Sequence, residues 1–98
     1  MAARPNAMTI NVAHASSTTS LHELLAGALD FPMYYGGNWD AFWECIRYPE
    51  RNDLPKQLIV KGMNVLDRRL PRDAAKLRRC LEDARLEIFD FQIEFIDV

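Results

Sequence analysis

The chain has 98 residues, of which 49% are hydrophobic and 27% are charged. This length suits one domain with a modest core, and the composition is that of a globular protein and argues against a disordered chain. We therefore expect a single domain over residues 1–98, with residues 1–7 disordered. The net charge of −2 and the pI near 5.6 do not favour general attraction to nucleic acid, which requires a basic surface.

The charges are distributed unevenly along the chain. Residues 30–50 contain four acidic side chains and one basic side chain, Arg47, whereas residues 67–85 contain seven basic and four acidic side chains. We interpret the basic stretch as a solvated helix face. Cys45 and Cys80 have no metal-binding spacing and form no disulfide framework, and we expect both to be buried free thiols. No secretory signal or membrane-spanning segment is expected, so the chain is assigned to the cytoplasm.

The first expected elements are a strand and a helix. Apolar and polar residues alternate over residues 8–12, which predicts a short strand. Residues 20–23, Ser-Leu-His-Glu, have the pattern of a capping box, and apolar residues follow at helical spacing from Leu21 to Leu29. Pro32 is expected to end this helix.

Residues 32–45 contain most of the chemical information in the chain. Gly36 and Gly37 indicate a turn, and Asn38 is a preferred N-cap residue for a helix that begins immediately after it. At ~100° per residue, one face of this helix carries Asp40, Trp43, Glu44 and Arg47. The opposite face is expected to pack on the core and carries Phe42, Cys45, Ile46 and, at its margin, Trp39.

The spacing of the two carboxylates on this helix is itself informative. Asp40 and Glu44 are four residues apart, and like charges at that spacing repel each other on a helix. Folding alone therefore does not favour the pair. A positively charged partner would.

The second half of the chain predicts a loop, two strands and a helix between them. Residues 48–56 read as a loop, and the apolar run at residues 58–60 reads as a buried strand. Residues 63–70 can add one or two helical turns, and Pro71 at a first-turn position begins a helix whose apolar residues continue to Ala84. The alternation over residues 89–95 is the clearest strand signal in the chain.

The predicted order is strand, helix, helix, strand, helix, strand. Strands separated by helices favour a parallel sheet with right-handed crossovers. We therefore expect an α/β fold, a small three-stranded parallel sheet packed by three to four helices.

Residues 32–45 resemble the signature of the barstar family, small cytoplasmic proteins that inhibit microbial ribonucleases. The family pattern is Pro-x-Tyr-Tyr-Gly-x-Asn-x-Asp-Ala-Leu-Trp-Asp-Cys, and the chain matches it in register at Pro32, Tyr34, Tyr35, Gly36, Asn38, Asp40, Ala41, Trp43 and Cys45. Phe42 replaces the leucine and Glu44 replaces the second aspartate, while residues 47–72 depart from the family. The resemblance implies a barstar-like architecture.

The resemblance and the acidic helix face together imply a partner-binding site. We assign to it Tyr34, Gly36, Gly37, Asn38, Trp39, Asp40, Trp43, Glu44, Arg47 and Asp83. Asp83 matches by position the further carboxylate that the family supplies from its last helix, with Glu82 beside it. Tyr35 is expected in the core, and Trp43 can serve packing, partner contact or both.

The resemblance implies a proteinaceous inhibitor, or immunity protein, that occludes the active site of a cognate bacterial ribonuclease or ribonuclease toxin domain. Carboxylates of the acidic helix would mimic RNA phosphates in a cationic cleft. We expect a monomer that forms a 1:1 complex with the nuclease. We expect no catalysis, no cofactor, no metal, and no direct contact with nucleic acid or membrane.

Two other classes remain open at this point. The acidic face could bind a basic protein that is not a nuclease. Alternatively, Asp40 and Glu44 could serve an enzyme as acid–base groups or metal ligands. Neither His14 nor His22 has suitable spacing to support them, and two carboxylates alone make a poor metal site.

Overall fold

The computed structural model describes residues 6–31, 36–47 and 54–98. Over these residues the chain forms β1 (Ala7–Asn11), α1 (Thr18–Leu29), α2 (Trp39–Ile46), β2 (Gln57–Lys61), α3 (Met63–Arg69), α4 (Pro71–Glu87) and β3 (Gln92–Ile96). The expected α/β architecture with a three-stranded parallel sheet is confirmed. None of the helices in the described part of the chain is long and apolar enough to cross a membrane.

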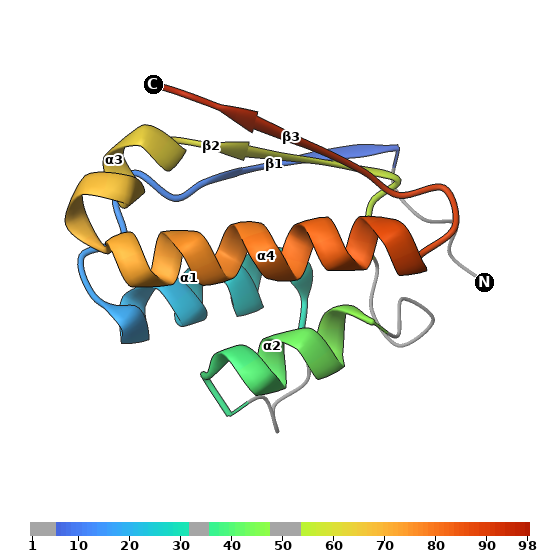
Figure 1. The fold of residues 1–98 in the computed structure, drawn as a ribbon, viewed down its shortest axis with the longest axis horizontal. Coiled ribbons are helices and arrows are strands. Elements are labelled where there is room, and N and C mark those ends of the chain that lie inside the picture. The colour runs from blue at the N-terminus through green and yellow to red at the C-terminus, as the bar shows by residue number, and fades with distance from the viewer. Residues whose placement is uncertain (1–5, 32–35, 48–53) are drawn as a thin grey trace.

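The sheet has the order β1-β2-β3, and both pairs of strands are parallel. The first strand begins one residue earlier than expected, at Ala7, which pairs with Gln57. Parallel neighbours need a crossover connection, and the helices supply both of them. Figure 1 shows the sheet along one side of the molecule, with α1, α2 and α4 on the other side.

The core lies between the sheet and the helices. The central strand contributes Leu58 and Val60, which are 1% and 0% exposed and follow the two-residue period of a strand. The two long helices bury side chains at spacings of three and four residues, as amphipathic helices do. They are Leu21, Leu25 and Leu29 from α1, and Ala74, Leu77, Leu81 and Ala84 from α4.

The N-terminus of α1 differs from the sequence prediction. The helix begins at Thr18, and its N-cap is Ser17, in an extended conformation with φ −152° and ψ 165°. The Ser17 hydroxyl oxygen accepts a hydrogen bond from the Ser20 backbone N–H, and the Ser20 hydroxyl oxygen accepts one from the Ser17 N–H, both at 3.0 Å. The capping box therefore spans residues 17–20 and not residues 20–23, because serine at the third helical position can return the bond that glutamate usually makes.

The last strand is shorter than the alternation of apolar residues predicted. Helix α4 continues to Glu87, and Asp90 has a left-handed φ of 58°, so the chain turns before the sheet. Phe89 lies in this turn and is 91% exposed, whereas Phe91 is buried just before β3. Pairing with β2 begins at Gln92, which marks the true start of the strand.

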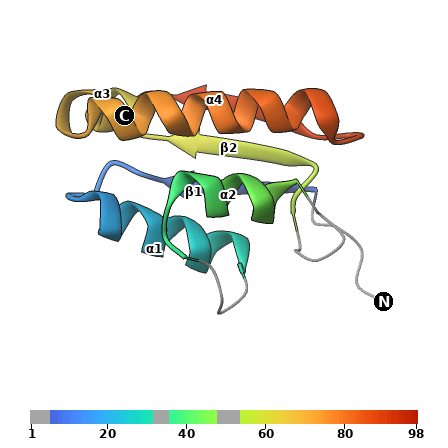
Figure 2. The same ribbon diagram turned by 60° about the horizontal axis from the view of Figure 1, so that its bottom comes forward.

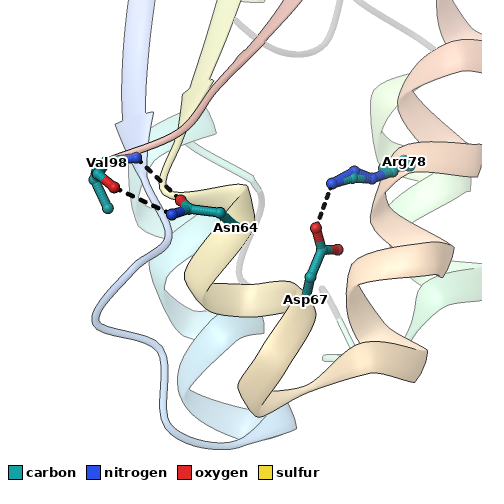
Figure 3. Close-up of polar contacts among 4 residues, drawn as sticks. All are labelled: Asn64, Asp67, Arg78 and Val98. Atoms are coloured by element: carbon teal, nitrogen blue, oxygen red, sulfur yellow. Dashed lines mark hydrogen bonds and ion pairs between the residues drawn. The ribbon is translucent and has the colours of Figure 1, made fainter.

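Side-chain contacts from α3 tie the C-terminal strand and α4 together. The Asn64 side-chain amide accepts a hydrogen bond from the Val98 N–H at 3.0 Å and donates one to the Val98 carbonyl oxygen at 3.1 Å (Figure 3). Helix α3 is the short helix that was predicted over residues 63–70. An ion pair of 2.7 Å joins its Asp67 to Arg78 of α4. Helix α3 thereby connects the end of the sheet to α4.

Part of the predicted 48–56 loop can be placed. Residues 48–53 lie outside the described residues. Leu54 is fully buried and Pro55 is also buried, so the segment that leads into β2 contributes to the core.

Candidate partner-binding surface

Helix α2 begins as the sequence predicted. Asn38 is extended, with φ −133° and ψ 169°, and its side-chain oxygen accepts a hydrogen bond from the Ala41 N–H at 2.8 Å. Gly37 has a left-handed φ of 69°, which glycine adopts without the steric cost that a side chain imposes. Asp40 lies in the first turn, where a negative charge interacts favourably with the helix dipole. The turn, the cap and the first carboxylate are therefore mutually consistent.

The two faces of α2 separate largely as expected. Phe42 and Ile46 are fully buried. Asp40 and Glu44 are exposed on the opposite side, and Trp43 is half-buried between the two faces. The predicted burial of both cysteines is only partly correct, because Cys45 and Cys80 are each half-buried.

Trp39, the first residue of α2, contacts both long helices. Its indole N–H donates a hydrogen bond to the Asp73 carboxylate of α4 at 3.0 Å. Its ring centroid lies 4.5 Å from that of His22 in α1 and 5.4 Å from that of Phe42. Figure 2 shows the resulting arrangement, in which α2 lies in front of the sheet with α4 on one side and α1 on the other. Trp39 thus has a packing role whatever it contributes to partner contact.

The exposed side of α2 borders a shallow hollow against α4. This hollow has a volume of about 210 Å³ and is lined by Trp39, Asp40, Trp43, Lys76, Arg79, Cys80 and Asp83. A neighbouring hollow of about 300 Å³ is lined by Trp43, Asp83, Leu86 and Glu87. We call these two hollows the α2–α4 surface. The structure places Asp83 in both hollows, next to Trp43, and in the first of them together with Asp40.

The α2–α4 surface carries both signs of charge. Lys76 and Arg79 of α4 lie in the first hollow with Asp40 and Asp83, so part of the predicted solvated basic face lines this surface. Burial raises the pKa of the Cys80 thiol, and the negative charges of Asp83 and Asp40 act in the same direction. These effects favour the protonated thiol over the thiolate.

Arg47 lies at the opposite end of α2, where it contacts two carboxylates and an aromatic ring. Its guanidinium lies 3.7 Å from Glu44 and 3.4 Å from Glu87 of α4. The same group lies over the Trp43 ring, 5.2 Å from its centroid. Glu44 is therefore paired within the molecule, whereas Asp40 makes no ion pair with any other described residue.

Several residues of this surface were not among those chosen from the sequence. They are Lys76, Arg79, Cys80, Leu86 and Glu87, which line the two hollows. Their spacing around Asp83 on one helix face was a usable signal, because residues three, four and seven positions away share that face. Of the residues that were chosen, Tyr34 lies outside the described residues, and Gly36, Gly37 and Asn38 form the exposed turn before α2.

The chemistry available at the α2–α4 surface is recognition of cations. Exposed carboxylates accept strong hydrogen bonds from guanidinium and ammonium groups. Tryptophan side chains next to such carboxylates can exclude water from these contacts. Within residues 6–31, 36–47 and 54–98, no three His, Cys, Asp or Glu side chains come together as metal ligands would.

Comparison with known proteins now adds to this geometry. Residues 6–96 match the family described as Barstar (barnase inhibitor). This chain belongs to the Barstar family. It is also 36% identical over 70 residues to a Bacillus subtilis (strain 168) protein named "Putative ribonuclease inhibitor YrdF", in an alignment that covers 71% of this chain and 75% of that protein. The resemblance first seen in residues 32–45 is confirmed, and the Barstar match also spans the divergent residues 47–72.

Proposed function

We propose that this Barstar-family chain is an inhibitor that binds the active site of a bacterial ribonuclease. The observation that carries the proposal is the α2–α4 surface, where Asp40 of one helix and Asp83 of another line the same hollow beside Trp43. Glu44 is exposed on the same helix as Asp40. Two names support the choice of partner, since the family is described as a barnase inhibitor and the Bacillus subtilis relative is named as a ribonuclease inhibitor.

The mechanism we propose is mimicry of RNA phosphates. A ribonuclease needs cationic side chains to bind phosphate and to stabilise the charge that develops on it during cleavage. Exposed Asp40 and Asp83 can accept charge-assisted hydrogen bonds from those cations. The inhibitor presents no scissile phosphodiester bond, so the cleft is occupied without turnover. One α2–α4 surface on one monomer fills one cleft, which gives a 1:1 complex.

The basic residues of the surface contribute to partner choice in this proposal. Lys76 and Arg79 share the first hollow with Asp40 and Asp83, and they repel any partner cation placed against them. The favoured enzyme therefore presents its cations to the carboxylates and not to this part of α4. Tyr34 and the turn at residues 36–38 are proposed as further contacts at the rim.

The proposal extends to the biological setting. We infer that the target is a nuclease made by the same cell or a toxin domain delivered by a neighbouring cell, and that the chain acts in the cytoplasm as an immunity protein. In either setting a tight, non-catalytic plug protects cellular RNA, and rapid association helps because the enzyme is harmful while it remains free.

The proposal is tested by titrating RNA cleavage by barnase and related small basic bacterial ribonucleases. Asp40→Asn with Asp83→Asn should weaken inhibition by at least about a hundredfold, as expected when buried partner cations lose their counter-charges. Glu23→Gln with Glu94→Gln is the matched control, because it removes two exposed negative charges outside the α2–α4 surface. Equal effects of the two pairs, or binding without loss of cleavage, would favour a general acidic interaction module.

A further inference from the structure

Three helices meet at the Asp73 carboxylate. Asp73 lies in the first turn of α4 and is half-buried. One of its oxygens accepts a hydrogen bond from the Thr18 hydroxyl of α1 at 2.6 Å, and the other accepts one from the Trp39 indole N–H of α2 at 3.0 Å. Each carboxylate oxygen therefore holds a different helix.

The surroundings of Asp73 keep it ionised. Burial acts to raise its pKa, but the hydrogen bonds from Thr18 and Trp39 and the charges of His22 and Lys76 outweigh burial, so the pKa lies below its ordinary value. Both hydrogen bonds are consequently made to a carboxylate, and bonds to charged groups are stronger than those between neutral groups. The contact to Trp39 is thus strong enough to influence where α2 lies.

Helix α2 depends on such contacts for its position. It has eight residues, and isolated helices of this length are not stable in water. Its start is fixed at two points on one side chain, because the Trp39 ring packs on His22 while the indole N–H is held by Asp73. Asp40 is the next residue, so whatever fixes Trp39 also fixes the first carboxylate of the α2–α4 surface.

We propose that Asp73 is a positioning residue that acts through the Trp39 indole to hold the start of α2, and with it Asp40, in the geometry that a partner meets. Asp73 does not line either hollow of the α2–α4 surface. Its effect on a partner is therefore indirect, through preorganisation that leaves less ordering to be done on binding. Only this last consequence rests on the proposed function.

Thr18 provides a matched control for the experiment. Thr18→Val and Trp39→Phe each remove one hydrogen bond to the same carboxylate, but only the second bond belongs to α2. Asp73→Ala removes both. Hydrogen exchange of the Phe42 amide, which bonds to the Asn38 carbonyl oxygen, reports opening of α2.

We expect Asp73→Ala and Trp39→Phe to speed exchange at Phe42 about tenfold or more, the size expected for losing a hydrogen bond to a charged group. Thr18→Val should leave it within about twofold and act on α1 instead. In the double variant of Trp39 and Asp73, exchange at Phe42 should be only slightly faster than in the more affected single variant. Both changes remove the same hydrogen bond, the one between Trp39 and Asp73. An unchanged Phe42 exchange rate in Trp39→Phe, or equal effects of all three single variants, would overturn the inference.

A spectroscopic signature separates positioning from general stabilisation. The chain has two tryptophans, so its NMR spectrum contains two indole N–H resonances. The Trp39 resonance should move in Asp73→Ala and stay in place in Thr18→Val. Equal movement of the Trp39 resonance in the two variants would mean that Asp73 supports the fold in general and has no specific hold on α2.

The binding arm uses barnase and the related ribonucleases. Asp73→Ala should slow association of the folded protein by about tenfold, and Thr18→Val should leave it within about twofold. Equal association rates in the two variants would contradict the effect on the partner. If the parent protein inhibits none of these enzymes, the proposed function fails, and the exchange and NMR results still decide the role of Asp73.

Discussion

Asp40 and Glu44 lie on the same exposed face, yet the structure predicts that they contribute unequally to partner binding. Glu44 is paired with Arg47 at 3.7 Å, and Arg47 also contacts Glu87 and the Trp43 ring. Asp40 has no ion pair among the described residues. A partner cation that approaches Glu44 must therefore compete with Arg47, whereas Lys76 and Arg79, which line the same hollow as Asp40, are not ion-paired with it.

The expected difference follows from the exposure of the pair. The side chains of Glu44 and Arg47 are 62% and 35% exposed, so water and salt screen their attraction and its worth stays below about 1 kcal/mol. Truncating a carboxylate that neutralises a buried partner cation costs about 2–5 kcal/mol. We therefore expect Asp40→Ala to weaken the binding free energy by this full amount of about 2–5 kcal/mol. Glu44→Ala should weaken it by up to about 1 kcal/mol less, a difference of up to about fivefold in Kd.

A double-mutant cycle measures this competition. The Kd of the complex is determined for Asp40→Ala, Glu44→Ala, Arg47→Gln and the double variant of Glu44 and Arg47. With Arg47 removed, the cost of Glu44→Ala should rise toward that of Asp40→Ala, and Arg47→Gln alone should tighten binding or leave it unchanged. A cost for Glu44→Ala that matches or exceeds that of Asp40→Ala, and is insensitive to Arg47→Gln, would refute the reasoning.

Four further predictions concern stability and association. Gly62→Ala should lower the free energy of unfolding in urea by about 2 kcal/mol or more, because Gly62 has φ 90° and a Cβ there would lie 2.8 Å from the Cβ of Ala13. Gly27→Ala in α1, where a Cβ meets nothing within 4 Å, should instead stabilise the protein by about 0.5–1 kcal/mol. Burial lowers the pKa of His22 below 6.5, against the raising effect of a neighbouring carboxylate, so stability present above pH 6.5 should decline as the pH falls below that value. His22→Gln should flatten this decline in urea melts. Finally, raising sodium chloride from roughly 0.05 to 0.5 M should slow association with the nuclease about tenfold and change dissociation by only a few-fold, as stopped-flow mixing would show; a flat association rate would place the interface elsewhere.

Local signals in the sequence predicted most of the fold. The roles of Asn38 as the N-cap of α2 and of Pro71 at the start of α4 could be predicted, because both act on residues next to them in the sequence. A strand at residues 58–60 was predicted because a short apolar run bounded by polar residues suits a buried central strand, and β2 extends one residue further at each end. The order of strands and helices then restricted the sheet to a parallel arrangement.

Competition between similar local patterns explains the errors in the boundaries. Ser17 and Ser20 both precede helical residues, and the choice between them depended on a reciprocal pair of hydrogen bonds that the 20–23 pattern did not suggest. Phe89 continues the alternation of β3, but strand pairing begins only at Gln92. Alternation describes one chain, whereas the start of a strand also depends on its neighbour.

The candidate site was only partly predictable, for a physical reason. The acidic face of α2 follows from helical spacing, but its neighbours on α4 depend on how two helices pack. Asp73 and Trp39 are 34 positions apart, and nothing in the sequence around either residue indicates that they form a hydrogen bond. Glu87 of α4 likewise lies beside Trp43 and 3.4 Å from Arg47 of α2 only because the two helices pack together.

The most direct test of the central claim is the dependence of inhibition on substrate concentration. If the α2–α4 surface occupies the active site of a ribonuclease, inhibitor and RNA compete for it. The apparent inhibition constant, measured for barnase or whichever related enzyme is inhibited, should then rise in proportion to the RNA concentration once this exceeds KM. An apparent inhibition constant that is independent of RNA concentration would show that the chain binds away from the active site, and would contradict the account.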